Sequence, residues 1–184
     1  MARRTPPRRA RPEGAGAGCL WAPWRSAYIT RARAGGARCI FCFGRLGERG
    51  RRQRLVLHAD PLALVMLNRY PYASGHILIA PRRHVASPEM LTAAELAATS
   101  AIIARAVAHL RAAYRPDGLN LGANLGRAAG AGIADHMHWH VVPRWEGDTN
   151  FMPVIGSTRV LPQALEETYA LLGPHFQAAG AALT

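Results

Sequence analysis

The sequence predicts an α+β domain, in which an antiparallel sheet of about five strands is combined with one long central helix and a C-terminal helix. Short apolar runs separated by turn residues are typical of strands joined by hairpins, and one long run with helical spacing is inserted among them. The glycines between the last two predicted strands are not followed by a helix pattern. This excludes the usual dinucleotide-binding signature of a parallel α/β fold.

Three strands are expected in the first half of the chain. Apolar runs at 55–58 and 62–68 flank the turn pair Asp60-Pro61, which predicts two antiparallel strands. Residues 68–75 include Pro71 and Gly75 and predict a loop. A third strand then covers residues 76–81.

The long helix and two more strands follow. Thr92 and Glu95 form a capping box, and Pro116 ends the helical pattern. We then expect a strand at 119–124, a Gly/Ala-rich loop at 125–135, a strand at 136–142 and a terminal helix at 161–172. The apolar positions that define the long helix are Leu96, Ile103, Val107, Leu110 and Tyr114.

Length and charge indicate one basic domain with a tail at each end. The chain has 184 residues and a formal charge of +12, and all 23 basic residues are arginine. Residues 1–18 combine five arginines with Pro, Gly and Ala, so we expect a disordered tail there, a folded domain over 19–178 and a short tail over 179–184. The remaining positive charge favours phosphorylated ligands.

Membrane, secreted and disulfide-rich classes are not expected. No apolar run approaches the roughly 20 residues that span a bilayer, and the N-terminus lacks a secretory signal pattern. The cysteines Cys19, Cys39 and Cys42 are odd in number, which argues against a disulfide framework. We therefore expect a cytoplasmic protein. The two-residue gap between Cys39 and Cys42 also suits zinc.

Three histidines alternate with apolar residues at His136, His138 and His140. In a strand, their imidazoles share one face, about 6.7 Å from one to the next. Neighbouring imidazoles could converge on one zinc ion, but the outer pair, about 13 Å apart, could not easily do so. A zinc enzyme is therefore one reading of this row.

Nucleophilic catalysis is the second reading of the same row. A neutral imidazole attacks phosphorus near pH 7 and forms a covalent intermediate. His138 is the natural nucleophile because it has a histidine on each side. The preceding loop offers glycine amides and Asn124 to hold phosphoryl oxygens.

These residues carry a family resemblance. The string from His136 to Val142, with three alternating histidines, resembles the signature of the histidine-triad (HIT) family, and further agreement lies at 66–69, 75–76 and 124–130. The likeness covers about residues 20–175. The segments 21–25 and 143–151 favour the bacterial branch that resembles diadenosine tetraphosphate phosphorylases and hydrolases. The resemblance implies a HIT-type sheet and cleavage of dinucleoside polyphosphates.

The resemblance also implies roles for individual residues. His138 would form a nucleotidyl-histidine intermediate, His140 would contact the phosphate and assist the leaving group, and the backbone carbonyl of His136 would orient the strand. Neither a redox cofactor nor a catalytic metal is required by this chemistry. The substrate-binding positions that match are Asn68, His76, Asn124, Gly130, Gly132 and Arg144.

A structural zinc ion is implied by the same resemblance. Family members with a Cys-x-x-Cys pair are similar in binding zinc through these thiolates, a histidine after the third strand and the first triad histidine. Here the four ligands would be Cys39, Cys42, His84 and His136. A closed set of four ligands is structural. The alternative is that the two cysteines are simply buried thiols.

Several alternatives stay open on the sequence alone. Gly132 stands where related phosphorylases tend to have a hydroxyl residue, so either phosphate or water could be the acceptor. Hydrolysis of nucleoside phosphoramidates needs the same nucleophile. A module that binds nucleic acid is suggested by the charge and the tryptophans, but the arginines are scattered and no RNA-binding signature is present. The family resemblance implies a homodimer. The helix at 96–114, with its Ala-rich flank, is a candidate for the interface.

Overall fold

A computed structural model describes residues 39–148 and 163–177 of the chain. The predicted tails at 1–18 and 179–184, Cys19, the segment 21–25 and residues 149–151 of the segment 143–151 lie outside these residues. The following description is therefore confined to the sheet, its helices and the loops that join them.

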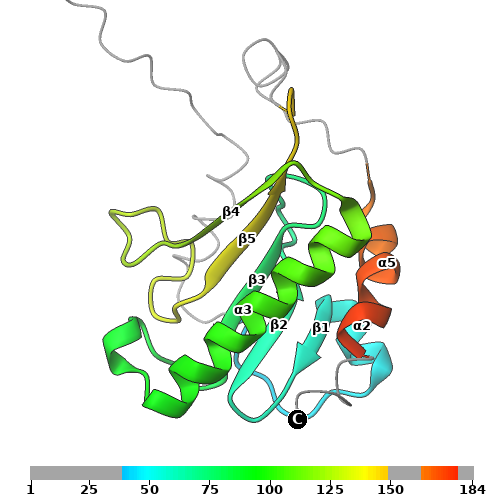
Figure 1. Ribbon diagram of the computed structural model, residues 1–184. Helices are drawn as coiled ribbons and strands as arrows, with labels where there is room; N and C mark the ends of the chain where they lie inside the picture. Colours follow the sequence, from blue (N-terminus) through cyan, green and yellow to red (C-terminus); the bar gives the residue numbers. More distant parts are fainter. Residues whose placement is uncertain (1–38, 149–162, 178–184) are drawn as a thin grey trace, which may run out of the picture.

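The described residues form a five-stranded antiparallel sheet with the strand order β1-β2-β3-β5-β4 (Figure 1). The predicted α+β class and the number of strands are confirmed. β3 and β5 lie at the centre, so the strand that follows the histidine row is paired on both sides. The strands are β1 (Val56–Ala59), β2 (Ala63–Leu67), β3 (Ile77–Pro81), β4 (Gly118–Ala123) and β5 (Trp139–Arg144).

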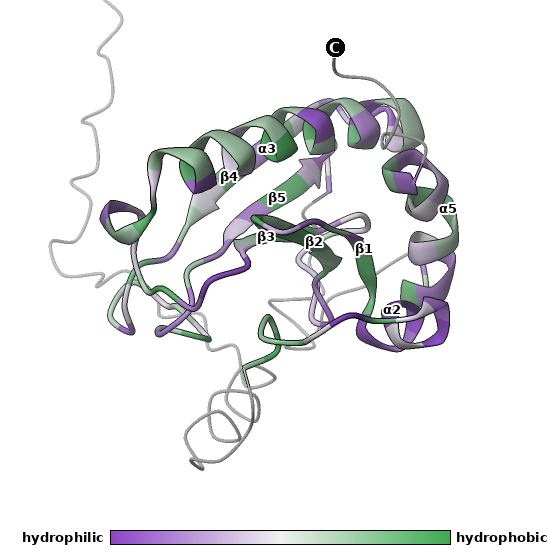
Figure 2. Cartoon of the chain, turned by 90° about the horizontal axis from the view of Figure 1, so that it is seen from below, coloured by the Kyte–Doolittle hydropathy of each residue, from purple (hydrophilic) through white to green (hydrophobic). Residues whose placement is uncertain are grey.

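Helix α3 (Ala93–Tyr114) crosses one face of the sheet, and α5 (Leu165–Gln177) packs beside it near β1 (Figures 1 and 2). The predicted capping box is present, because Thr92 and Glu95 bond reciprocally at the first turn. The buried stripe of α3 differs from the predicted one: Leu96 is 46% exposed. The residues that α3 buries are Glu95, Thr99, Ile102, Ala106 and Leu110.

Helix α3 bears on the expectation that no segment of the chain spans a membrane. Its 22 residues are long and apolar enough, by length and composition alone, to cross a membrane. In the fold, however, Ile102, Ala106 and Leu110 belong to the same buried cluster as residues of β2, β3 and β5. The apolar side chains on this face of α3 are therefore buried in the core of the domain.

Two short elements were not predicted, α2 (Glu48–Arg54) and the 3-10 helix at Pro88–Met90. Neither buries a residue, so neither has the apolar periodicity that indicates a helix in a sequence. α2 instead contains Gly50 and four exposed or half-buried arginines. It lies beside β1, below α5 in Figure 1.

Candidate active site and metal cluster

The histidine row enters the sheet later than predicted. β5 begins at Trp139, so His136 and His138 lie in the segment that leads into the strand and only His140 is within it. The rings of His138 and His140 still lie close together, with centroids 5.0 Å apart. His136 turns to a different group of side chains, described below.

One hydrogen bond fixes which nitrogen of His138 carries the proton when the ring is neutral. Its Nδ1 donates a hydrogen bond to the backbone carbonyl of His136, 3.0 Å away, because a carbonyl oxygen can only accept. The proton is therefore on Nδ1, and the lone pair is on Nε2. Burial lowers the pKa of His138, which is only 5% exposed, and this favours the neutral form that can attack an electrophile.

His140 is joined to two of the predicted substrate-binding residues by hydrogen bonds. Its Nδ1 lies 2.9 Å from Nε2 of His76, and Nδ1 of His76 lies 3.3 Å from the amide nitrogen of Asn68. β3 and β5 pair directly at this point, with Leu78 opposite His140. The fold thus brings Asn68, His76, His138 and His140 into one group.

The loop between β4 and β5 places the other predicted binding residues. Asn124 follows the β4 residue that pairs with Trp139, and continuation of this register carries it toward His138. A Cβ on Gly130 would lie 4.0 Å from the Asn124 amide nitrogen, so the two residues are neighbours. Gly130 has a positive φ of 85°, which favours glycine. Gly132 lies in the same half-exposed stretch, with no hydroxyl to offer.

Arg144 lies apart from the histidines. It is four residues beyond His140 in β5, about 13 Å along an extended strand. Its guanidinium bonds Asp148 (Nη2 to Oδ1, 2.7 Å) and Asn120 (Nη1 to Oδ1, 2.9 Å), and this pairing raises the pKa of Arg144. Within this chain, the charge of Arg144 is therefore paired with that of Asp148 at the C-terminal end of β5.

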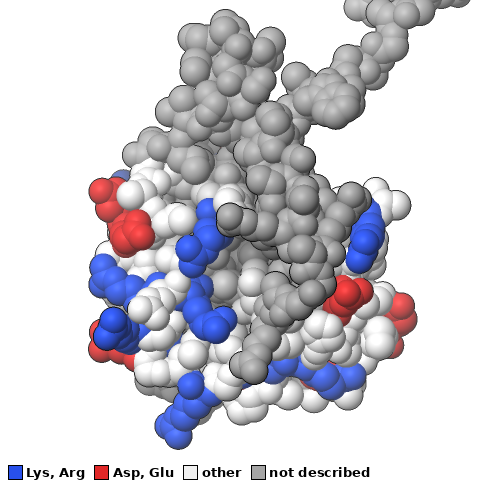
Figure 3. All heavy atoms as spheres, turned by 180° about the vertical axis from the view of Figure 1, so that it is seen from behind, with Lys and Arg blue, Asp and Glu red and all other residues white. Residues whose placement is uncertain are grey.

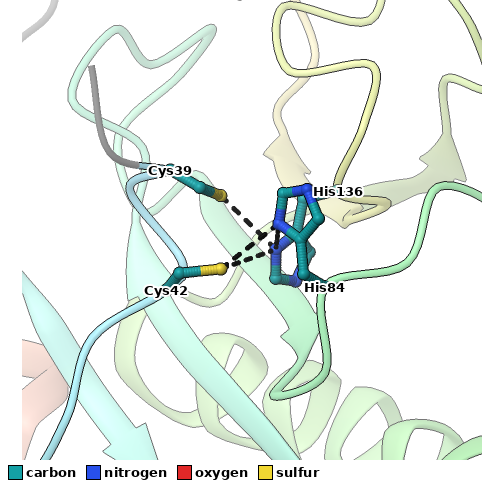
Figure 4. Close-up of side chains that lie close together, drawn as sticks. All are labelled: Cys39, Cys42, His84 and His136. Carbon is teal, nitrogen blue, oxygen red and sulfur yellow. Dashed lines mark hydrogen bonds between the residues drawn. The ribbon is translucent and has the colours of Figure 1, made fainter. Parts of the chain in front are cut away.

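The four residues that the sequence grouped as zinc ligands meet at one point (Figure 4). The cysteines come from the segment before α2, His84 follows β3 and His136 precedes β5. One ligand atom from each side chain lies within 4.8 Å of all the others. The residues are Cys39, Cys42, His84 and His136.

Four of the six separations between ligand atoms in this cluster are close to those of a tetrahedral zinc site. Nδ1 of His136 lies 3.4 Å from Sγ of Cys39, 3.5 Å from Sγ of Cys42 and 3.2 Å from Nδ1 of His84, which is 3.3 Å from Sγ of Cys42. With Zn–S bonds of about 2.3 Å and Zn–N bonds of about 2.0–2.1 Å, neighbouring ligands should lie about 3.3–3.8 Å apart. The donor set and its spacing both suit this metal.

A hydrogen bond and the burial of the ligands also favour cation binding at the cluster. Nε2 of His136 donates to the carbonyl of Pro81 at 2.9 Å, so its Nδ1 presents a lone pair to the other three ligands. Burial lowers the pKa of His136, which favours this neutral form. Burial also raises the pKa of the Cys39 thiol, so a thiolate there needs a nearby positive charge.

Two aromatic residues at the site were missed from the sequence. Phe41 is fully buried, and its ring centroid lies 5.0 Å from that of His136 and 4.9 Å from that of His138. Tyr72 stacks on His76, with centroids 4.8 Å apart, and lies 6.2 Å from His140. The sequence signal for Phe41 was its position between Cys39 and Cys42. The signal for Tyr72 was its position in the loop between Pro71 and Gly75.

Comparison with known proteins agrees with this geometry. The family model of the HIT domain matches residues 49–147. The chain belongs to the HIT family. Among curated HIT proteins, AP-4-A phosphorylase from Mycobacterium tuberculosis is 38% identical over 158 residues, which cover 83% of this chain and 81% of that protein.

Solved structures of HIT proteins share the fold. A Zn-bound histidine triad family protein from Mycobacterium smegmatis aligns with a TM-score of 0.56 and 25% identity, over 85% of this chain and 96% of that one. A hypothetical histidine triad nucleotide-binding protein from Sulfolobus tokodaii aligns with a TM-score of 0.54 and 27% identity, over 68% and 82%. The HIT-type architecture expected from the sequence is therefore confirmed.

Proposed function

We propose that this HIT protein cleaves dinucleoside polyphosphates of the diadenosine tetraphosphate type through a covalent intermediate on His138. The observation that carries the proposal is the hydrogen bond from His138 Nδ1 to the His136 carbonyl, which leaves the buried Nε2 with a free lone pair. The 38% identity to a protein named AP-4-A phosphorylase supports this class of substrate.

The first step forms one bond and breaks another. Nε2 of His138 attacks the α-phosphorus, the bond from phosphorus to the bridging oxygen breaks, and its electron pair leaves with the polyphosphate. The imidazole of the intermediate carries a positive charge, and the His136 carbonyl stabilises it through the Nδ1 proton. Water or phosphate then displaces His138 and restores the neutral ring.

The neighbouring residues bind and orient the substrate in this proposal. Asn68 and His76 contact the ribose and phosphate side, and His140 presents a hydrogen-bond donor to the reacting group. Asn124 and the backbone amides of Gly130 and Gly132 hold the phosphoryl oxygens. Because Arg144 is bonded to Asp148, we do not include it among the residues that bind the phosphate of a substrate held by the same chain.

Replacement of the nucleophile tests the proposal. His138→Asn should reduce turnover of diadenosine tetraphosphate by at least about 1,000-fold, because covalent catalysis is lost, while affinity for AMP changes little. Labelled nucleotide should form an acid-labile adduct with the unmodified protein. Turnover that survives in the variant, with no trapped adduct, would contradict the covalent mechanism.

The acceptor is tested in the same assay with and without inorganic phosphate. ADP that forms only when phosphate is present indicates phosphorolysis, and AMP with ATP indicates hydrolysis. Gly132 contributes only its backbone to either reaction. A purely nucleic-acid-binding protein would instead bind through salt-sensitive contacts that survive His138→Asn. Against such a role, the arginines are spread around the face shown in Figure 3 rather than gathered into one stripe.

We also propose that the Cys/His cluster binds a structural zinc ion. Its four side chains would complete a tetrahedral shell, so no position remains for a substrate. The ion would tie the segment before α2 to the loops that follow β3 and precede β5. Its contribution is then to fix His136, and through it the carbonyl that orients His138.

A homodimer is the third part of the proposal. β4 is at the edge of the sheet, with Leu121 48% exposed, and Leu96 on α3 is 46% exposed. Within residues 39–148 and 163–177, β4 pairs only with β5, and a strand edge of this kind, together with exposed leucines, favours burial against another protein surface. A second copy of this chain presents the same edge and can pair with it about a twofold axis.

A further inference from the structure

The end of β2 lies against the C-terminal end of α2. The main-chain N–H of the residue before Asn68 donates to the carbonyl of the residue after Arg54, at 2.9 Å. The residue after Asn68 is Arg69, and its Nη2 donates to the carbonyl of Gln53 at 3.1 Å. These two bonds flank Asn68 on one segment and Arg54 on the other, so the two residues lie opposite each other.

The side chain of Arg54 lies on the face of the sheet that carries the reactive histidines. Its guanidinium carbon is 5.6 Å from the centre of the Phe43 ring. Phe43 packs against the buried cluster that includes Leu78, and Leu78 is the β3 residue opposite His140. Residues opposite each other in a sheet share one face. Helix α3 packs in the other buried cluster, on the opposite face.

The surface around Arg54 is basic. Residues 45–54 include five arginines and one acidic residue, and Arg82 places a further guanidinium over the Phe43 ring, 4.7 Å from its centre. Arg54 and Arg69 are exposed, and no ion pair within the described part of the chain includes either of them. We call Arg54, Arg69 and Arg82 the basic corner. Guanidinium groups in this state favour phosphate ligands.

We propose that the basic corner binds a second phosphate of the substrate, attached to the 3′ oxygen of the ribose that Asn68 contacts. The inference rests on the proposed function, in which His138 attacks the 5′ α-phosphorus of the same nucleotide. The substrate class is then a polyphosphate-linked nucleotide with a 3′-phosphoryl group, either a free nucleotide or the first nucleotide of an RNA strand. Arg54 and Arg69 are specificity residues, since they take no part in the exchange of bonds.

The shape of a nucleotide gives the reason. The 5′ and 3′ oxygens leave the ribose in different directions, so a nucleotide whose 5′ phosphorus is at His138 directs its 3′ oxygen away from the histidines, past Asn68. Arg69 is the next residue of the chain, and Arg54 lies opposite Asn68. A phosphate there would accept charge-assisted hydrogen bonds from the guanidinium groups. Diadenosine tetraphosphate has only a hydroxyl at this position.

AMP and adenosine 3′,5′-bisphosphate test the inference by calorimetry, because they share the base, the ribose and the 5′ phosphate. We expect the bisphosphate to bind at least about tenfold more tightly, the gain from one hydrogen bond to a charged group. The double variant with Arg54→Gln and Arg69→Gln should reduce this ratio to about twofold or less. Arg111→Gln, which removes an exposed arginine on α3, is the matched control and should keep the ratio.

A third ligand distinguishes the two sources of the 3′ phosphate. The 5′-phosphorylated dinucleotide of adenosine carries a phosphodiester at the same oxygen. A gain in affinity for both the dinucleotide and the bisphosphate supports the basic corner as a site for the first nucleotide of an RNA strand. A gain for the bisphosphate alone supports it as a site for a free nucleotide with two phosphates.

The remaining outcomes separate this inference from the proposed function. Equal affinity of the unmodified protein for AMP and for both 3′-phosphorylated ligands would overturn the inference alone, as would a ratio that the double variant leaves unchanged. A protein that neither binds AMP nor cleaves diadenosine tetraphosphate would overturn the proposed function, and the basic corner as a substrate site with it.

Discussion

Gly75 shows how one residue without a side chain supports the site. It precedes His76 with a φ of +76°, and a Cβ there would lie 2.9 Å from the Tyr114 ring and 3.3 Å from Leu110. The loop that carries Asn68 and Tyr72 therefore packs directly against the C-terminal end of α3. Glycine is required here by both the backbone conformation and the close approach.

Gly75→Ala should lower the free energy of unfolding by about 2–4 kcal/mol, from left-handed strain plus overpacking. Gly147 is a matched control because its φ is also positive, at 72°, but a Cβ there would meet nothing within 4 Å. Gly147→Ala should therefore cost only about 1 kcal/mol. Urea unfolding measures both, and equal losses would show that the contact with Tyr114 has no energetic effect.

The cysteine pair carries the second prediction at this scale. Cys42→Ser should remove zinc from the purified protein and lower its Tm, because the remaining three ligands cannot close the shell. Metal analysis by mass spectrometry gives the stoichiometry. Cys19→Ser, a change of another thiol, should leave the zinc content at one ion per chain, and retention of zinc by the Cys42 variant would argue against the site.

At the scale of elements, the start of α3 is held by more than its capping box. Arg83 bonds Glu95 through two nitrogens, at 2.9 and 2.7 Å, and Glu95 also accepts from the N–H of Thr92. Hydrogen bonds lower the pKa of Glu95 to about 2. The bond from the Arg83 guanidinium has the largest effect, and the bond from the Thr92 N–H has the next largest. This ties the segment after β3, which includes His84, to the first turn of α3.

The stabilising effect of Glu95 should depend on pH. Its folded pKa lies below its ordinary value of 4.5, so its contribution is present above about pH 4.5 and is lost as the pH falls toward 2. The difference in unfolding free energy between the protein and Glu95→Gln should shrink over this range. A difference that stays constant between pH 4.5 and pH 2 would contradict the assignment.

The elements also show what could be predicted from the sequence and what could not. Alternating apolar residues and turn pairs predicted all five strands, and Thr92 and Glu95 predicted where α3 begins. The late start of β5 was missed because alternation continues through His136 and His138, although the ladder begins only at Trp139. The Tyr72 contact depends on how a loop folds back on β3, which periodicity does not describe.

At the scale of the whole molecule, the proposed dimer gives a direct measurement. Light scattering after size exclusion should give about 40 kDa, twice the 19.9 kDa of one chain. Leu121→Arg, which places a charge on the exposed strand at the edge of the sheet, should lower the mass toward that of one chain. A single-chain mass for the unmodified protein would contradict the dimer.

His136 links the two functional groups of the molecule. Its side chain belongs to the Cys/His cluster, and its carbonyl holds the proton of the nucleophile. Treatment with a chelating agent during purification should therefore weaken catalysis indirectly, because His136, whose carbonyl orients His138, would no longer be held by the ion. Sensitivity to EDTA in an assay would then report a loss of orientation, and it should be distinguished from the removal of an ion that takes part in the chemistry.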